Sequence, residues 1–221
     1  KARIILQDVD YLQETASIAG KSLGGIIHLG VPPSIGPYIL PYVIPVIHKN
    51  YPDLLLHIIE EPPRKLEKGL DQGKFDLLFT VTPTAAAELT SMTLFNEPLF
   101  VGIAAENKLS NNKEIAENDL KGQKVLTLGS GHQLFEQTQS IANKYDCQIL
   151  SEYQGSNLDA LRHMVSMDMG ISFFPGLYAS SEIYRNKELV VRPFKRNNIK
   201  RSLGLVWRRT SPRIKDFHII A

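Results

Sequence analysis

The residues best suited to chemistry form a turn of small and polar side chains, Gly129-Ser130-Gly131-His132-Gln133. This turn follows a short apolar run, 124–128, and precedes a segment with helical spacing, 134–145. A helix that begins here would direct its unpaired amide groups and the positive end of its dipole toward a ligand. The turn is therefore expected to bind an anion, a carboxylate or a small polar molecule. His132 has a second reading, as a structural histidine that bonds to backbone at the helix start, and both readings stay open.

A second turn with the same properties lies inside Gly25–Pro52. An apolar run at 26–31 predicts a buried strand, which Pro32 and Pro33 end. Ser34 is placed to cap a helix whose apolar residues recur at helical spacing, namely Leu40, Val43, Ile44 and Ile47. Pro41 and Pro45 fall inside that helix and are expected to bend it. Ligands of open α/β sheets bind where such helices begin, so Pro33, Ser34 and Ile35 are expected to face a cleft.

Other polar or aromatic residues follow predicted strands and are expected to face the same cleft. They are Thr80, Asn157, Phe174 and Pro175. Thr80 is predicted to end its strand. Thr80 and Asn157 have an equally good reading as caps or strand-end hydrogen bonders, and either Ser156 or Asn157 is expected to cap the next helix.

The chain carries no pattern typical of an enzyme or a metal protein. We find no HExxH motif, no Gly-rich phosphate loop and no supported Ser/His/Asp arrangement. The six histidines lack metal-ligand spacing, and Cys147 reads as a lone, small, buried apolar residue. We therefore expect a protein that is not an enzyme and that uses no cofactor and no metal.

The order of apolar and helical segments predicts two α/β units. The first has a βαβαβ order, which implies a parallel sheet with right-handed crossovers. Strands are expected at 26–31, 54–59, 75–81, 92–104 (one strand or two), 124–128, 148–153, 170–174, 189–191 and 202–207. Helices are expected at 36–50, 64–72, 134–145, 158–165 and 212–220.

Composition excludes several classes of protein. The 221 residues are 43% hydrophobic and 22% charged, with a net charge of +2, which is typical of a globular domain and favours neither nucleic acid nor membrane as partner. No membrane-length apolar run or signal peptide is present. A single cysteine cannot form an internal disulfide, which fits a cytoplasmic location. The chain begins at Lys1 without methionine, so we expect it to be part of a longer protein.

Several short motifs, in their order and spacing, resemble one known family. They are Ser34-Ile35-Gly36-Pro37-Tyr38, Leu40-Pro41, Ile44-Pro45, Leu70-Asp71-Gln72-Gly73-Lys74-Phe75-Asp76, Leu94-Phe95-Asn96-Glu97-Pro98-Leu99, Gly131-His132, Leu161-Arg162-His163-Met164-Val165 and Gly170-Ile171-Ser172-Phe173-Phe174-Pro175. Over 24–217 the chain resembles the regulatory domain of LysR-type transcriptional regulators, and most of all the OxyR-like peroxide sensors among them.

The resemblance implies an α/β fold of two Rossmann-like subdomains joined by two crossover strands, as in type 2 periplasmic binding proteins. It assigns 1–23 to the end of a linker helix, 24–97 and 203–221 to subdomain I, and 98–202 to subdomain II. An N-terminal winged helix-turn-helix would precede them and is absent from this chain. An effector would bind in the cleft between the subdomains, lined by Pro33, Ser34, Ile35, Thr80, Ser130, Gly131, His132, Gln133, Asn157, Phe174 and Pro175.

The chain departs from the OxyR-like pattern at the positions that sense peroxide. The resemblance places the reactive cysteine after Gly-His, where this chain has Gln133, and the resolving cysteine at Ala142. A glutamine amide cannot ionise to a nucleophile, so the thiol switch is lost. The hydroxyl of the family's peroxide pocket is kept at Ser34, whereas a second is lost at Pro63.

The resemblance implies the effector-sensing and oligomerisation domain of a bacterial DNA-binding activator with a possible link to oxidative stress. Its partners would be a small-molecule effector, a second copy of the chain and, through the full-length protein, DNA and RNA polymerase, with a tetramer at full length. The alternative is a periplasmic-type solute-binding protein, which shares the architecture. A third reading is an enzyme on the same scaffold, for which no residue set argues.

The helix at 36–50 carries more apolar side chains than one buried face needs. Those left over are Tyr38, Ile39, Tyr42 and Val46. Extra apolar surface is typical of an interface. The resemblance implies that this helix pairs antiparallel with the helix 134–145 of a partner, so these four residues are expected to form a homodimer interface.

Overall fold

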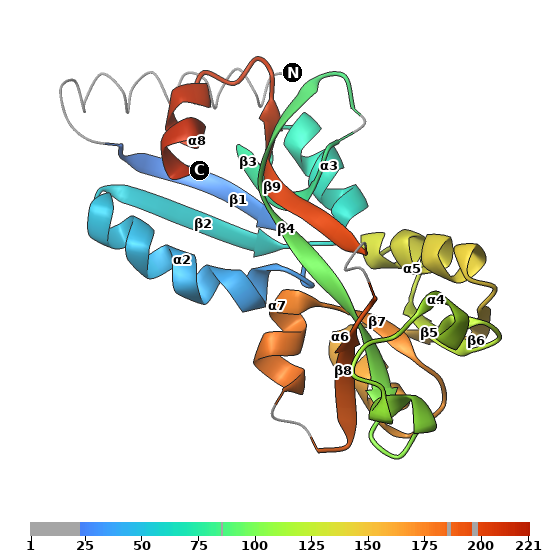
Figure 1. Ribbon diagram of the computed structural model, residues 1–221. Coiled ribbons are helices and arrows are strands. Elements are labelled where there is room, and N and C mark those ends of the chain that lie inside the picture. Colours follow the sequence, from blue (N-terminus) through green and yellow to red (C-terminus); the bar gives the residue numbers. More distant parts are fainter. Residues whose placement is uncertain (1–22, 85, 185–186, 196–198) are drawn as a thin grey trace. The chain divides into compact units, whose positions relative to one another are not determined.

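The described part of the chain divides into two compact α/β units. The computed structural model describes residues 23–84, 86–184, 187–195 and 199–221 (Figure 1). The first unit contains the described residues up to Asn96 together with Ser202–Ala221, and the second contains Glu97–Arg201. The predicted end of a linker helix, 1–23, lies outside the described residues except for Leu23. In the part that is described, no helix is long and apolar enough to cross a membrane.

The first unit is built on a sheet with the strand order β2-β1-β3-β9-β4. Strand β1 runs parallel to β2 and β3, and β9 runs antiparallel to β3. This is the predicted parallel arrangement with one returning strand added. The strands are β1 (Gly25–Val31), β2 (Leu54–Glu60), β3 (Leu77–Thr82), β4 (Leu89–Ala104) and β9 (Lys200–Arg208).

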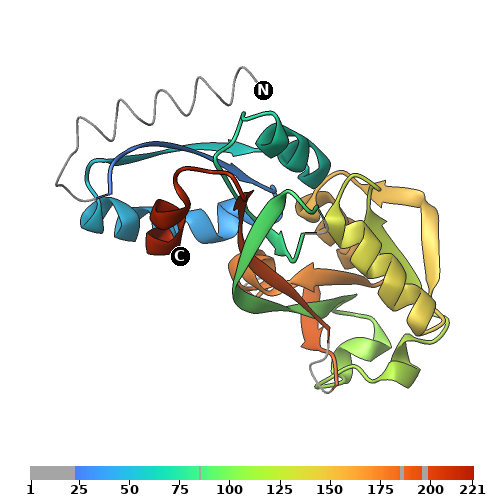
Figure 2. The ribbon, with the colours of Figure 1, turned by 90° about the horizontal axis from the view of Figure 1, so that it is seen from above.

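Helices cover both faces of this sheet. Figure 2 shows α2 (Gly36–Asn50) and α8 (Ile214–Ile220) on one side and α3 (Pro63–Asp71) on the other. Helix α3 presents Leu66 and Leu70, four residues apart on one face, to a core with Phe75, Leu78, Leu89 and Val206. On the opposite face Trp207 packs against Phe217 of α8, with ring centroids 5.7 Å apart.

Helix α2 differs from the prediction at its start and along its buried face. It begins at Gly36, so the N-cap position belongs to Ile35 and the prediction that Ser34 occupies it is wrong by one residue. Pro37 instead occupies the first turn, where its missing N–H costs little. The helix contains Pro41 and Pro45 as predicted. Val43 is 37% exposed, so it does not belong to the buried face assigned to it.

The second unit combines two groups of strands. Strands β5 (Lys124–Leu128) and β6 (Gln148–Gly155) pair in parallel, and β4 pairs antiparallel with β7 (Ser172–Pro175) and β8 (Leu189–Pro193). The backbone of Ile171 links the groups by hydrogen bonds to Lys124 and Leu126 of β5. Its helices are α4 (Glu117–Leu120), α5 (Gln133–Lys144), α6 (Leu158–Ser166) and α7 (Gly176–Tyr178), with a 3₁₀ turn at Lys108–Asn111 and a π-helical turn at Ala179–Ile183.

Strands β4 and β9 each have residues in both units, and they are the only described strands that do. Near the point where the chain passes from one unit to the other, Ser202 donates a hydrogen bond to Asn96 at 2.8 Å within the first unit. Within the second, Arg201 Nε donates to Glu97 Oε2 at 2.5 Å. The predicted α/β units with two connecting strands are thus present.

Candidate functional site

The turn between β1 and α2 is held by backbone hydrogen bonds and one buried side chain. The carbonyl of Pro32 accepts from the amides of Ile35 at 2.9 Å and Gly36 at 3.0 Å. Ile35 is fully buried, whereas Pro33 and Ser34 are partly exposed. Ile35 therefore anchors the turn in the core, and Ser34 offers the hydroxyl that a ligand could reach.

The turn before α5 is more open. Ser130 and Gly131 are exposed, and a Cβ added at Gly131 would meet no atom within 4 Å. His132 is the residue before the helix, its side chain makes no cap hydrogen bond, and Gln133 is the first helical residue. The α5 amides at this end are therefore not capped by His132, which leaves room for a polar ligand.

The surroundings of His132 favour the neutral form of its imidazole. Burial lowers the pKa of its imidazole, and a hydrogen bond to the backbone of Ser156 opposes that effect. The lowered pKa favours the neutral ring at neutral pH, which has one donor and one acceptor nitrogen. The contact with Ser156 also brings the α5 turn next to the start of α6, where Asn157 lies.

Asn157 caps α6, which resolves the open choice between Ser156 and Asn157. Its Oδ1 accepts a hydrogen bond from the Ala160 amide at 2.8 Å. The residue is exposed, so the cap lies at the surface beside His132. The structure thus brings His132 and Asn157 together within the second unit.

Thr80, Phe174 and Pro175 are buried in their own units. Strand β3 continues to Thr82, so the prediction that Thr80 ends this strand is wrong, and Thr80 lies opposite Gly204 of β9. Phe174 is fully buried and stacks on Tyr178 with ring centroids 5.6 Å apart. Pro175 lies opposite Leu99 of β4. In this structure these three side chains, like Ile35, belong to the packed interior.

Sequence reasoning missed a polar network beside Phe174. The Tyr178 hydroxyl donates to Asp159 Oδ1 at 2.8 Å and accepts from Arg162 Nε at 3.2 Å. Burial, followed by the hydrogen bond to Asp159, raises the pKa of Tyr178 far above its ordinary value. The tyrosine is therefore a permanent hydrogen-bond donor. The three residues span two helices and have no shared motif, so no sequence signal could have grouped them.

Cys147 is partly buried and poorly suited to redox chemistry. Its Sγ donates to the Leu120 carbonyl at 3.3 Å, and burial together with the charge of Asp146 raises the pKa of the thiol. Across the described residues, no group of three or more His, Cys, Asp or Glu side chains could hold a metal ion. The polar turns, rather than a reactive side chain, are the features available for binding.

Comparison with known proteins gives one consistent result. Residues 20–219 match the family described as the LysR substrate binding domain. The chain is 31% identical over 212 residues to the DNA-binding transcriptional dual regulator OxyR of Escherichia coli K12, covering 96% of this chain and 69% of that protein. The match therefore extends over both units and the strands that connect them.

Solved structures agree with the sequence match. The crystal structure of the reduced form of OxyR has a TM-score of 0.80 at 29% identity, covering 89% of this chain and 92% of that one. The oxidised form has a TM-score of 0.81 at 28% identity, covering 90% and 94%. The predicted fold, two Rossmann-like subdomains joined by two crossover strands as in type 2 periplasmic binding proteins, is confirmed.

Proposed function

Because this chain belongs to the LysR substrate-binding domain family and is OxyR-like, we propose that it is the effector-sensing and oligomerisation domain of a bacterial LysR-type transcriptional regulator. The observation that carries this is the match over 96% of the chain to a DNA-binding regulator. In the full-length protein the domain would act in the cytoplasm, with DNA and RNA polymerase as partners, as a dimer or a tetramer. The same match disfavours a periplasmic solute-binding protein.

The domain does not use the two-thiol switch of peroxide sensors. Relatives described as hydrogen peroxide-inducible genes activators align over nearly the whole chain, yet Cys147 is its only cysteine. Gln133 and Ala142 occupy the positions where the resemblance expects thiols. We infer that the signal is a bound molecule, which shifts the domain between two arrangements because it binds one of them more tightly.

The two helix-start turns support a small polar or anionic effector. The Ser34 turn offers a partly exposed hydroxyl group, whereas the amides of Gly36 and Tyr38 in the first turn of α2 already donate to Pro32 and Ile35. The His132 turn offers an exposed loop and the first amides of α5. The α5 turn belongs to the type of site that takes anions and polar groups.

A thermal-shift screen tests this function. Small carboxylates and other polar metabolites are added to the wild-type chain, and a true effector at 100 times its Kd should add about 2.7 kcal/mol to the free energy of unfolding. Ser34→Ala and His132→Ala should each reduce the shift, whereas Met167→Ala, at an exposed site on neither turn, should leave it unchanged. A shift that survives both turn variants would place the effector elsewhere.

A further inference from the structure

Two histidines lie opposite each other on neighbouring strands of the first unit. His28 of β1 is in parallel register with His57 of β2, and Figure 1 shows the two strands side by side. Residues directly opposite on adjacent strands lie about 5 Å apart and point to the same face of a sheet. The two imidazole centroids are 5.4 Å apart, and the ring planes are tilted by 57°. The fold thus brings together two side chains that are far apart in the sequence.

Both histidines project from the face of the sheet that α3 covers only in part. Successive residues of a strand point to opposite faces, and Leu29 and Leu56, which neighbour the two histidines, line the apolar pocket between α2 and the sheet. His28 and His57 therefore point to the α3 side. The His28 side chain is 38% exposed and His57 is exposed, so solvent reaches both rings.

A carboxylate fixes the orientation of the His28 ring. Asp76 Oδ2 lies 3.2 Å from His28 Nδ1, and it also accepts a hydrogen bond from the His28 amide at 2.8 Å. An ionised carboxylate is only an acceptor, so Nδ1 carries the proton of the neutral ring and Nε2 keeps a lone pair that a metal ion can use. Histidines that bind metals in proteins are typically held by a carboxylate in this way. The Asp76–His28 pair therefore has the arrangement of a metal ligand and its supporting group.

The spacing of the two rings matches that of imidazoles that share a metal ion. At the usual Zn–N distance of about 2.0–2.1 Å, two rings on one tetrahedral zinc ion have centroids about 5 Å apart. The observed separation of 5.4 Å is close to this value. Imidazole nitrogens suit zinc, copper and nickel, whereas magnesium and calcium prefer oxygen ligands. The pair therefore favours a divalent transition metal over Mg²⁺ and Ca²⁺.

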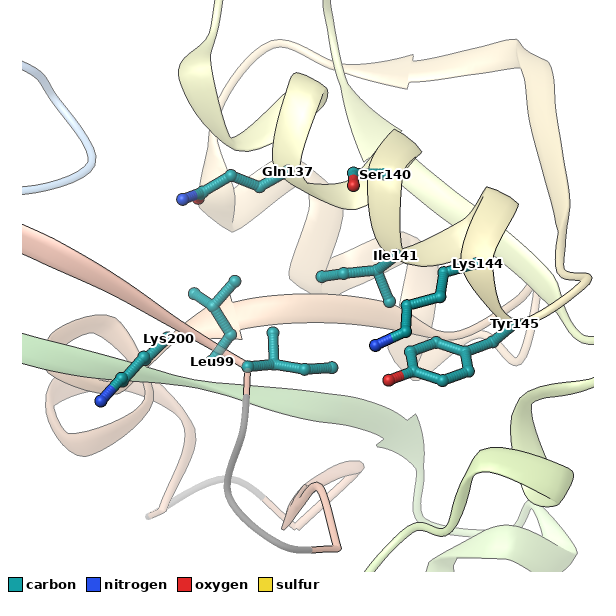
Figure 3. Close-up of a pocket in the computed structure, with 8 residues that line it drawn as sticks. Leu99, Gln137, Ser140, Ile141, Lys144, Tyr145 and Lys200 are labelled. Carbon is teal, nitrogen blue, oxygen red and sulfur yellow. The ribbon is translucent and has the colours of Figure 1, made fainter. Parts of the chain in front are cut away.

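The chain supplies two ligands to this site, which leaves it open to solvent. Among the described residues, no group of three or more His, Cys, Asp or Glu side chains could hold a metal ion, so Asp76 orients His28 and is not a third ligand. The pocket beside α5, drawn in Figure 3, and the apolar pocket beneath α2 are lined by other residues and add no ligand. Water would complete the coordination of the metal ion.

We propose that His28 and His57 bind a zinc ion through one ring nitrogen each, with Asp76 as a positioning residue. The ion would link β1 to β2, the terminal strand of the described sheet. Binding would stabilise the first unit, because the unfolded chain does not hold the two histidines together. The site shares no residue with the Ser34 and His132 turns, so it does not rest on the proposed function.

A zinc titration of the ¹⁵N-labelled chain, followed through the imidazole nitrogen signals, tests the site. Zn²⁺ should shift the ring signals of His28 and His57 but not those of His48, and Mg²⁺ should shift none of them. Loss of a supporting group typically costs about 10–100-fold in metal affinity, so Asp76→Asn should weaken zinc binding within that range. His57→Gln removes a ligand and should weaken binding at least as much. His48→Gln, which removes an exposed histidine of the same unit, should leave the affinity unchanged.

Thermal unfolding gives a second readout. Zn²⁺ should raise the unfolding temperature of the wild type and of His48→Gln, but not that of His57→Gln. His57 is exposed and its replacement should leave the fold intact, so this variant decides the proposal even if Asp76→Asn is unstable. Equal zinc affinity in the wild type and His57→Gln would overturn the proposal. An equal loss of affinity in His48→Gln would also overturn it, because zinc would then bind exposed histidines without selectivity.

Discussion

The carboxylate of Glu97 is 2% exposed and accepts two hydrogen bonds, from Arg201 Nε at 2.5 Å and from the Leu177 amide at 2.8 Å. It therefore joins β4 and β9 to the start of α7 within the second unit. Nothing in the sequence indicated this role, because a single Glu before a proline is typical of an exposed turn. Because the pair is buried, removing one partner is expected to lower the free energy of unfolding strongly.

Replacing Glu97 should destabilise the chain strongly. Glu97→Gln keeps the size but leaves the buried Arg201 without its carboxylate, and we expect a loss of about 3 kcal/mol in the free energy of unfolding, measured in urea. The control is Glu61→Gln, since Glu61 pairs with the exposed Lys65 at 3.4 Å and should cost below about 1 kcal/mol. Equal losses in the two variants would show that burial of the Glu97 pair is unimportant.

Mild hydrogen peroxide should leave the protein unchanged. The thiolate is the reactive form of cysteine, and burial together with Asp146 disfavours it at Cys147. Intact-mass spectrometry and circular dichroism before and after treatment should give the same results for the wild type and for Cys147→Ser. Rapid, reversible oxidation of Cys147 with a spectral change absent from Cys147→Ser would instead mean that a new thiol switch exists.

At the level of elements, a single cap fixes the start of α6. Asn157→Ala removes the acceptor for the Ala160 amide and should cost about 1 kcal/mol in the free energy of unfolding. Ser156→Ala, one residue earlier and equally exposed, should stay within about 0.5 kcal/mol. Thermal unfolding of both variants measures the difference. A larger loss of stability for Ser156→Ala would mean that Ser156, and not Asn157, caps the helix.

Helices and strands with a clear pattern of apolar residues were predictable from the sequence. Elements that depend on tertiary contacts were not. Strand β5 was predicted at its observed bounds, because its apolar run is framed by turn residues. Helix α7 and the following π-helical turn were missed, since they are short and rely on buried Tyr178 and Ile183 for support. Strand β4 continues past Asn96 and Pro98, where a break was possible, and the Glu97 side chain between them bonds to Arg201 and to the Leu177 amide.

The candidate site was predictable only in part. The exposed turn before α5 was located correctly, because glycine and serine between a strand and a helix mark a turn. The positions of Ser34 and Thr80 within their elements were wrong by one or two residues, since helix starts and strand ends have weak local signals. The network of Asp159, Arg162 and Tyr178 could not be predicted, because it joins residues of two separate helices.

At the scale of the whole molecule, α2 is expected to mediate a homodimer. Tyr42 and Val46 are 76% and 56% exposed, and Tyr38 and Ile39 are partly buried. Val46→Asp should lower the mass from dimer to monomer, because a charge in an apolar interface is unfavourable. Light scattering at micromolar protein concentration measures this molecular mass. Met167→Asp, at a 75% exposed site that is not part of α2, should leave the dimer intact, and a monomeric wild type would contradict the proposal.

The bonded pairs Asn96–Ser202 and Glu97–Arg201 have a consequence for how this domain can be rebuilt. The chain leaves the first unit and returns to it through neighbouring residues, so the second unit is an insertion into the first. A tight turn of a few residues could replace 97–201 and rejoin β4 to β9 as a hairpin. The second unit could likewise be produced alone, because its two ends meet. Such a cassette allows a sensing module to be exchanged without redesigning the unit that carries it.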